Sequence, residues 1–222
     1  MSETKSIKKR LDEIVYDRVL NDLLKGVYKE GTEFVPMNIA EMYGVSITPV
    51  TIALKRMYFE RIVDRTSGGK YFVPVFSVRQ FVELCDARYM IELRALEALI
   101  EKRGKTKNSE ILDKINDCAR DCFKYADQGD IVHSIRSDLG FHQMIVQTCE
   151  NEFFDQFFLT IRNKIICWSY SEGFTSLHQR TAATEHFVLV EAIVEGDKTK
   201  AFDLIYKHID EACLRVAGKH MR

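Results

Sequence analysis

The sequence lacks any apolar run near the ~18 residues that a membrane-spanning helix needs, so we expect no membrane partner. Its first residues, MSETKSIKKRLDE, include basic side chains but no apolar segment behind them, which argues against a secretory signal and favours the cytoplasm. There is no Gly-rich phosphate loop and no internal repeat. There are only 3 prolines, which fits the composition of a soluble globular protein.

The sequence also lacks a strong charge of either sign. The net charge is −1, with +2 over residues 1–75 and −3 over the remainder. The positive sign of the first part suits a DNA-binding domain, but a charge of +2 is too small to establish one. Hydrophobic residues make up 46% of the chain, which is typical of a globular protein with one large or two small domains. The 6 cysteines lie mostly in apolar helical patterns and are interpreted as small buried side chains.

Residues 1–75 are patterned as three short helices followed by a β-hairpin. Apolar residues recur at helical spacing in the first helix, residues 36–43 form the second, and Gly44 makes the turn into the third. Around a Ser-Gly-Gly turn, β-prone residues predict strands at about 62–66 and 70–75. This order predicts a winged helix-turn-helix, a DNA-binding fold.

The stretches LKGVYKEGTEF and IAEMYGVSITPVTIALKRM resemble the head of bacterial GntR-family transcription regulators. The chain keeps the framework of that pattern at Gly26, Gly31, Ala40, Gly44, Val45, Ser46, Thr48, Pro49, Val50, Ala53 and Leu54. The resemblance implies that the third helix and the wing bind operator DNA. The candidate DNA-contacting residues are Ile47, Thr48, Thr51, Lys55, Arg56 and Lys70.

Three departures from this pattern fall on the DNA side of the third helix. The family pattern has Arg, Arg and Glu where this chain has Ile47, Thr51 and Ile52. An arginine makes bidentate contacts to guanine and charged contacts to phosphate, so two losses per subunit weaken or redirect binding to the usual family operator. A structural or protein-binding role for this domain therefore remains an alternative.

Residues 76–222 are patterned as six or seven helices joined by short loops, which predicts an antiparallel bundle. Asp138 and His142 are spaced i, i+4 on one helix, and His186 and His208 lie on two later helices. Three imidazoles and a carboxylate suit Zn, Ni, Mn, Fe or Co. On spacing alone, however, a histidine on an apolar helix is more often simply buried or exposed than a metal ligand.

A second resemblance concerns residues 79–215, which are similar to the effector-binding domain of the FadR-like branch of GntR regulators, called FCD. The shared motifs are Arg88–Glu92, Asp138–Phe141–His142 with Asn151, Glu185–His186, Ala192–Ile193 with Gly196–Asp197, and a final His208. In metal-binding members the Asp and three His of these motifs are the ligands. The resemblance thus implies a divalent transition metal held by Asp138, His142, His186 and His208.

The expected function is a homodimeric transcriptional regulator that senses a small carboxylate at this metal. Arg88 is the main candidate to bind the carboxylate, unless it forms a salt bridge within the bundle; Asn151, Arg162 and Arg180 are further candidates. We expect no enzyme activity, although an open metal site with Glu185 as an acid or base keeps a metalloenzyme as an alternative. A metal- and acid-binding dimer that no longer binds DNA is another.

Overall fold

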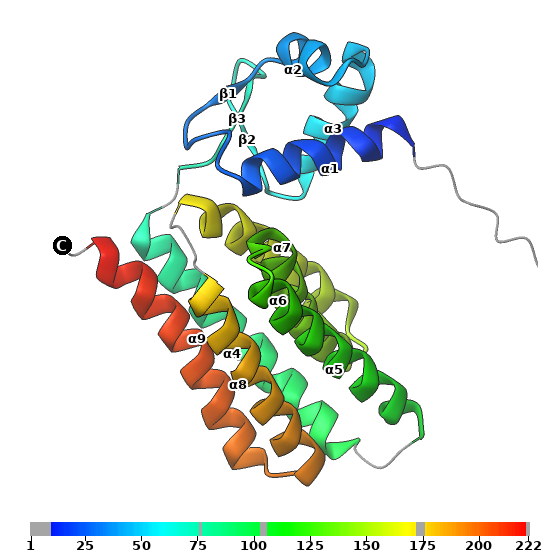
Figure 1. Cartoon of the computed structure of the whole chain (residues 1–222), viewed down its shortest axis with the longest axis vertical. Coiled ribbons are helices and arrows are strands. Elements are labelled where there is room, and N and C mark those ends of the chain that lie inside the picture. The colour runs from blue at the N-terminus through cyan, green and yellow to red at the C-terminus, as the bar shows by residue number, and fades with distance from the viewer. Residues whose placement is uncertain (1–9, 76, 103–105, 172–175, 221–222) are drawn as a thin grey trace, which may run out of the picture. The chain divides into compact units, whose positions relative to one another are not determined.

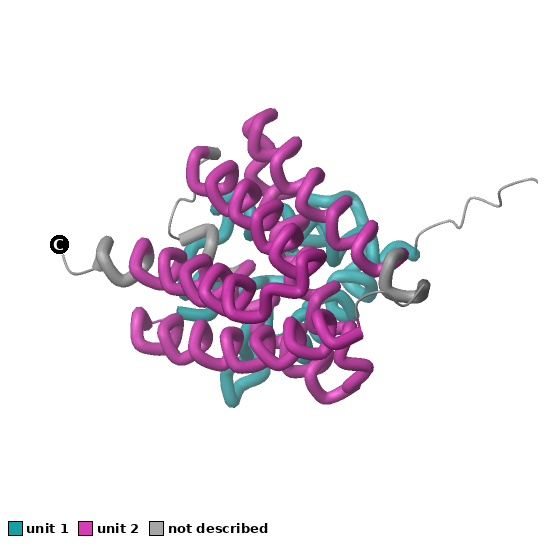
Figure 2. Tube along the Cα trace, turned by 90° about the horizontal axis from the view of Figure 1, so that it is seen from below, with its two compact units in different colours: residues 1–75 teal, residues 76–222 magenta. Residues whose placement is uncertain are grey.

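The computed structural model describes residues 10–75, 77–102, 106–171 and 176–220. The chain forms two compact units, residues 1–75 and residues 76–222 (Figures 1 and 2). Within the described parts, no helix combines the length and the apolarity needed to cross a membrane. Both units are mainly helical, which confirms the predicted fold class.

The N-terminal unit holds three helices, α1 (Leu11–Leu24), α2 (Pro36–Tyr43) and α3 (Ile47–Phe59). Gly44 ends α2 in the left-handed conformation, with φ +65°, and makes the tight turn into α3. A residue with a side chain would adopt this backbone conformation only with strain. The inward faces of α1 and α3 are apolar and fully buried, through Val15 and Val19 on α1 and Val50, Leu54 and Met57 on α3.

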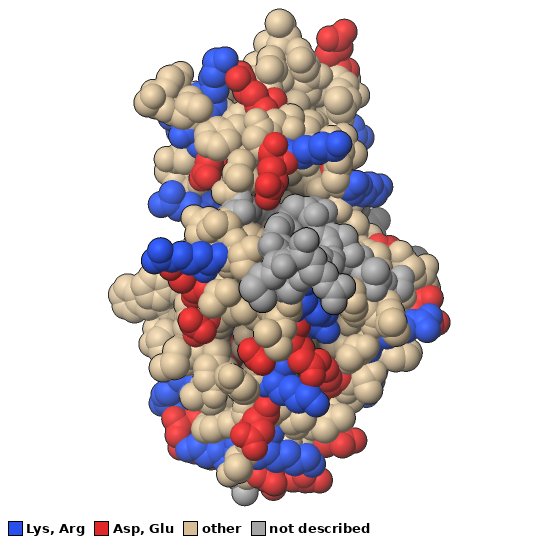
Figure 3. Space-filling view, turned by 90° about the vertical axis from the view of Figure 1, so that its left-hand side faces the viewer, with Lys and Arg blue, Asp and Glu red and all other residues tan. Residues whose placement is uncertain are grey.

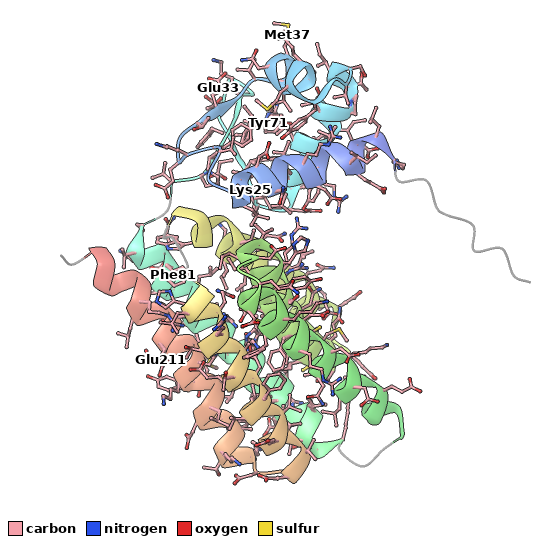
Figure 4. All side chains as sticks on the ribbon, in the orientation of Figure 1. Lys25, Glu33, Met37, Tyr71, Phe81 and Glu211 are labelled. Carbon is pink, nitrogen blue, oxygen red and sulfur yellow. The ribbon has the colours of Figure 1, made fainter. Side chains whose placement is uncertain are left out.

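The wing is a three-stranded antiparallel sheet in the order β1–β3–β2. Its strands are β1 (Glu33–Phe34), β2 (Asp64–Arg65) and β3 (Tyr71–Phe72); Figure 4 labels Glu33 and Tyr71 on the two neighbouring strands β1 and β3. The hairpin strands are shorter than predicted because Ile62 donates its N–H to Met57 of α3, and Pro74 has no N–H to donate. The two-residue strand β1 is too short to show an alternating pattern and was not predicted.

The C-terminal unit consists, in its described residues, of six helices: α4 (Val78–Glu101), α5 (Thr106–Asp127), α6 (Ile131–Gln147), α7 (Glu152–Ser171), α8 (Ser176–Glu195) and α9 (Lys198–His220). Helix α4 packs against α9, and α8 packs against both α5 and α9. In Figure 1, α4 and α9 run in opposite directions, as the predicted antiparallel bundle requires. The four helices α4, α6, α8 and α9 position the site described next.

Candidate metal centre

The four predicted ligands come together inside the helical bundle. Asp138 and His142 lie on α6, His186 on α8 and His208 on α9, and one ligand atom of each lies within 4.8 Å of the others. His142 Nε2 is 3.1 Å from His208 Nε2 and 3.2 Å from His186 Nε2. The three imidazoles are buried, so the cluster is shielded from water.

Two of the ring nitrogens that meet at this cluster, on His142 and His208, present lone pairs to each other. His142 Nδ1 lies 2.6 Å from a Glu92 carboxylate oxygen, and His208 Nδ1 lies 2.7 Å from a Glu185 carboxylate oxygen. An ionised carboxylate only accepts hydrogen bonds, so we assign the ring proton to Nδ1 in both histidines, which leaves each Nε2 as an unprotonated acceptor. Acceptors about 3 Å apart repel each other unless a cation lies between them, so the donor set fits a metal ion.

The spacing of the ligand atoms also fits a metal ion. His186 Nε2 lies 3.4 Å from Asp138 Oδ1, which extends the set of short separations to all four side chains. Metal–nitrogen bonds of about 2.1 Å place neighbouring ligand atoms roughly 3.0–3.4 Å apart. Imidazole nitrogens with one carboxylate oxygen suit a divalent transition metal better than Mg²⁺ or Ca²⁺, which prefer oxygen alone.

The carboxylates of Glu92 and Glu185 lie outside the cluster and orient two of its three histidines. Glu92, fully buried on α4, accepts from His142 with one oxygen and from Arg88 Nε with the other, at 2.6 Å each. Glu185, one residue before His186 on α8, accepts from His208 on the neighbouring helix. Carboxylate partners of this kind fix the ring orientation and make an imidazole a stronger ligand.

The third imidazole, His186, is oriented by packing instead of by a carboxylate. Its ring stacks on Phe141, with ring centres 4.0 Å apart and planes 14° apart. Its Nδ1 atom is buried and has no hydrogen-bond partner among the described residues. Burial, with smaller contributions from nearby positive charge, lowers the pKa of both His142 and His186 well below 6.5, which keeps these rings in the neutral form that binds metals.

A small cavity adjoins the cluster on the side of Asp138 and His208. Its volume is about 40 Å³, and Arg88 and Arg215 reach it from α4 and α9. His178 and Gln179 of α8 also line this cavity, although no sequence motif points to them. At about 10–15 Å³ of such space for each water, it holds roughly three waters, which makes it a candidate for a very small ligand.

The predicted effector-binding residues fall in different places. Arg88 lines the cavity and also forms the salt bridge with Glu92, so both roles considered for it are present. Asn151 accepts from the N–H groups of Phe153 and Phe154 at the start of α7.

The remaining two candidates are engaged elsewhere. Arg162 donates to Gln143, at 2.7 Å, and Arg180 pairs with Asp127 on the surface. The residues that line the cavity include neither these two arginines nor Asn151.

The predicted DNA-contacting side chains are exposed, but not all are free. Ile47, Thr48, Thr51 and Lys55 lie on the exposed side of α3, and the Thr51 hydroxyl donates to the Ile47 carbonyl, at 3.0 Å. The Arg56 guanidinium pairs with Glu60 and lies over the Tyr16 ring. In the wing, Lys70 pairs with Glu33. Lys55 makes no ion pair within the described part of the chain, so its ammonium group is available to a phosphate.

The charges on the drawn surface are mixed. Figure 3 shows Lys and Arg interspersed with Asp and Glu over both units on this face. A broad basic area would have indicated strong non-specific attraction to nucleic acid. The face shown therefore adds no such argument, and DNA binding rests on the winged helix itself.

Comparisons with known proteins agree with both resemblances. The family model "FCD domain" matches residues 83–211, and the model "Bacterial regulatory proteins, gntR family" matches residues 11–73. The chain is 21% identical over 207 residues to the HTH-type transcriptional repressor GlaR of Escherichia coli (strain K12), covering 87% of this chain and 90% of GlaR. It is 25% identical over 207 residues to the gluconate operon transcriptional repressor of Bacillus licheniformis, covering 89% and 79%.

A solved structure shows the same fold. The structure of E. coli McbR/YncC superposes with a TM-score of 0.76 at 19% identity, covering 96% of this chain and 100% of that chain. The match extends over both units, so the pairing of a winged helix with a six-helix bundle is shared with that protein. The resemblances deduced from the motifs are confirmed.

Proposed function

The chain belongs to the GntR family of bacterial regulatory proteins with an FCD domain, and we propose that it senses a small carboxylate through a divalent metal in that domain. Asp138, His142, His186 and His208 would hold the metal. Bound there, the metal would supply vacant coordination positions for carboxylate oxygens. Arg88 would bind the same carboxylate through its guanidinium.

One observation carries this proposal: three imidazole Nε2 atoms and a carboxylate oxygen meet in a buried space. Without a cation the arrangement is unfavourable, because the lone pairs of His142 Nε2 and His208 Nε2 face each other at 3.1 Å. The buried Arg88 Nη2 has no hydrogen-bond partner among the described residues, and it lines the adjoining cavity. An anion beside the metal would satisfy it.

The output of this sensing is a change in DNA affinity. A homodimer would place two copies of α3 against two half-sites, and ligand binding would alter operator affinity with a coupling of ~1–3 kcal/mol. The apolar Ile47 and Ile52 and the short Thr51 stand where the family pattern has charged side chains. We therefore expect a site preference unlike the usual family operator, read partly through apolar contacts such as those with thymine methyl groups.

Substituting Thr51→Arg is expected to tighten DNA binding at least fivefold, because one good arginine contact contributes ~1–3 kcal/mol. Thr51 is exposed, so the longer side chain can be accommodated without repacking. Fluorescence anisotropy with the DNA upstream of the protein's own gene measures the change. Binding should also weaken steeply as salt rises, because phosphate contacts release counterions.

The matched control is Val194→Arg, which adds the same charge at an exposed position of α8 in the other unit. It should leave DNA affinity unchanged. Equal effects of the two substitutions would mean that net charge alone is responsible. An absence of saturable binding by the wild-type chain at low salt, with and without metal, would favour the alternative that DNA binding has been lost.

A further inference from the structure

Two packed helices each contribute three residues to the cavity beside the metal cluster, and α6, α7 and α8 complete its lining. Helix α4 contributes Phe81, Cys85 and Arg88, and α9 contributes His208, Ala212 and Arg215. Both sets follow the spacing i, i+4, i+7, so each occupies a single helix face. Each set spans about two helical turns, roughly 10 Å, along its helix.

The two arginines of these stripes lie at opposite ends of the cavity. Contact between the rings of Tyr89 and Tyr206, 5.3 Å apart, sets the register of α4 against α9. Because α4 and α9 run in opposite directions (Figure 1), the chain from Tyr206 to Arg215 advances toward the start of α4. The Cα atom of Arg215 thus lies about two turns from the level of Arg88.

Helix geometry directs both guanidinium groups into the space between them. A long side chain on a helix points back toward the N-terminus and covers the preceding turn. Arg88 thus extends over the turn at Cys85, and Arg215 extends over the turn at Ala212. Since the helices are antiparallel, the two side chains extend toward each other from the two ends of the cavity.

Each of the two arginines has a buried N–H that finds no acceptor among the described residues. Arg88 Nη2 and Arg215 Nε make no hydrogen bond among the described residues. A buried charged donor without an acceptor is destabilising, and two guanidinium groups directed at one cavity also repel each other. An anion between them would accept from both and remove both penalties.

Arg215 also lies near the acidic groups of the site. It is close enough to Asp138 and Glu185 to interact with both electrostatically. Arg88 and Arg215 are the arginines that line the cavity, so their guanidinium groups are the ones there that attract an anion.

We propose that Arg215 is a second carboxylate-binding residue, which together with Arg88 clamps a short monocarboxylate beside the metal and disfavours dicarboxylates. This inference rests on the proposed sensing of a carboxylate and specifies its class. The cavity volume agrees, because space for roughly three waters is space for one carboxylate group of three heavy atoms. The same cavity has no room for a second carboxylate group.

The test uses calorimetric titration of the full chain loaded with Zn²⁺. Formate and acetate are the monocarboxylate probes, and malonate and succinate are the dicarboxylate probes. Wild-type protein should bind the first two at least tenfold more tightly than the last two. Arg215→Gln should weaken monocarboxylate binding at least tenfold, because a charge-assisted hydrogen bond is lost. Its Zn²⁺ affinity, measured separately with a competing chelator, should stay within about threefold of wild type, because Arg215 is not a ligand.

The control is Arg120→Gln, the same substitution on the exposed face of α5, which should leave monocarboxylate affinity unchanged. If Arg215→Gln fails to fold by circular dichroism, Arg215→Lys serves instead. It keeps the charge but loses the Nε donor, and it should still weaken monocarboxylate binding at least threefold.

Wild-type affinity for monocarboxylates in the folded Arg215 variant would overturn the clamp. Equal affinity for malonate and acetate would overturn the ligand class. Failure of wild-type Zn²⁺-loaded protein to bind any of the four acids would instead overturn the proposed carboxylate sensing, and with it this inference.

Discussion

Replacing Asp138 with asparagine is expected to lower the affinity for Zn²⁺ at least a hundredfold. The substitution keeps the size of the side chain but removes the single negative charge among the four ligands. Loss of a partner that only orients a ligand already lowers metal affinity ~10–100-fold, so loss of a charged ligand should do more. Competition with a chromophoric chelator of known zinc affinity measures the change.

Asp130→Asn is the matched control for this experiment. Asp130 also lies next to α6 and also contacts a histidine, since its carboxylate is 2.7 Å from His133 Nδ1, but both side chains are exposed. Asparagine can still cap the start of α6 as Asp130 does. Zinc affinity should be unchanged in this variant. A similar small loss in both variants would mean that Asp138 is not a ligand.

Replacing Glu92 with alanine is expected to destabilise the folded chain by ~3–5 kcal/mol, because it leaves the buried Arg88 charge without a partner. The Arg88 and Glu92 side chains are only 5% and 0% exposed, and the same change leaves His142 Nδ1 without its acceptor. Urea unfolding of the metal-free protein, followed by circular dichroism, measures the free energy of unfolding. The transition of the C-terminal unit is the relevant one, since two units can unfold separately.

The same helix provides the control. Arg79 and Glu83 on α4 form an ion pair with the same i, i+4 spacing, at 2.8 Å, but their side chains are 87% and 58% exposed. Glu83→Ala should change stability by less than ~1 kcal/mol, because water screens an exposed pair. Equal losses in Glu92→Ala and Glu83→Ala would show that burial of the first pair has no energetic consequence, contrary to this account.

Much of the fold could be predicted from the sequence because its local signals agree with one another. Gly44 makes the turn between α2 and α3, and Val50, Leu54 and Met57 share the buried face of α3. The signals for the helix-turn-helix therefore lie within one short stretch of sequence. The strand β1 could not be predicted, because its two residues pair with β3, which follows them by more than 35 positions, and local pattern does not report such contacts.

The site could be predicted only in part. The four ligands followed from motifs, but spacing along the chain could not show that four side chains from three helices meet at one point. From the sequence, Glu185 is a candidate acid or base. In the structure its carboxylate accepts a hydrogen bond from His208 on another helix. Arg215 and His178 reach the cavity through helix packing, and no motif identified them. Conversely, the Asn151 side chain caps α7, which a motif match does not reveal.

The central claim is that the buried cluster binds a divalent transition metal, and elemental analysis of the protein tests it most directly. Purified chain is incubated with Zn²⁺, desalted and analysed by inductively coupled plasma mass spectrometry, beside a variant that carries His186→Ala and His208→Ala. The account predicts about one zinc per wild-type chain and almost none in the variant, since two of four ligands are gone. A folded wild-type chain that retains no more zinc than the variant, and none of Ni²⁺, Mn²⁺, Fe²⁺ or Co²⁺ under the same treatment, would contradict it.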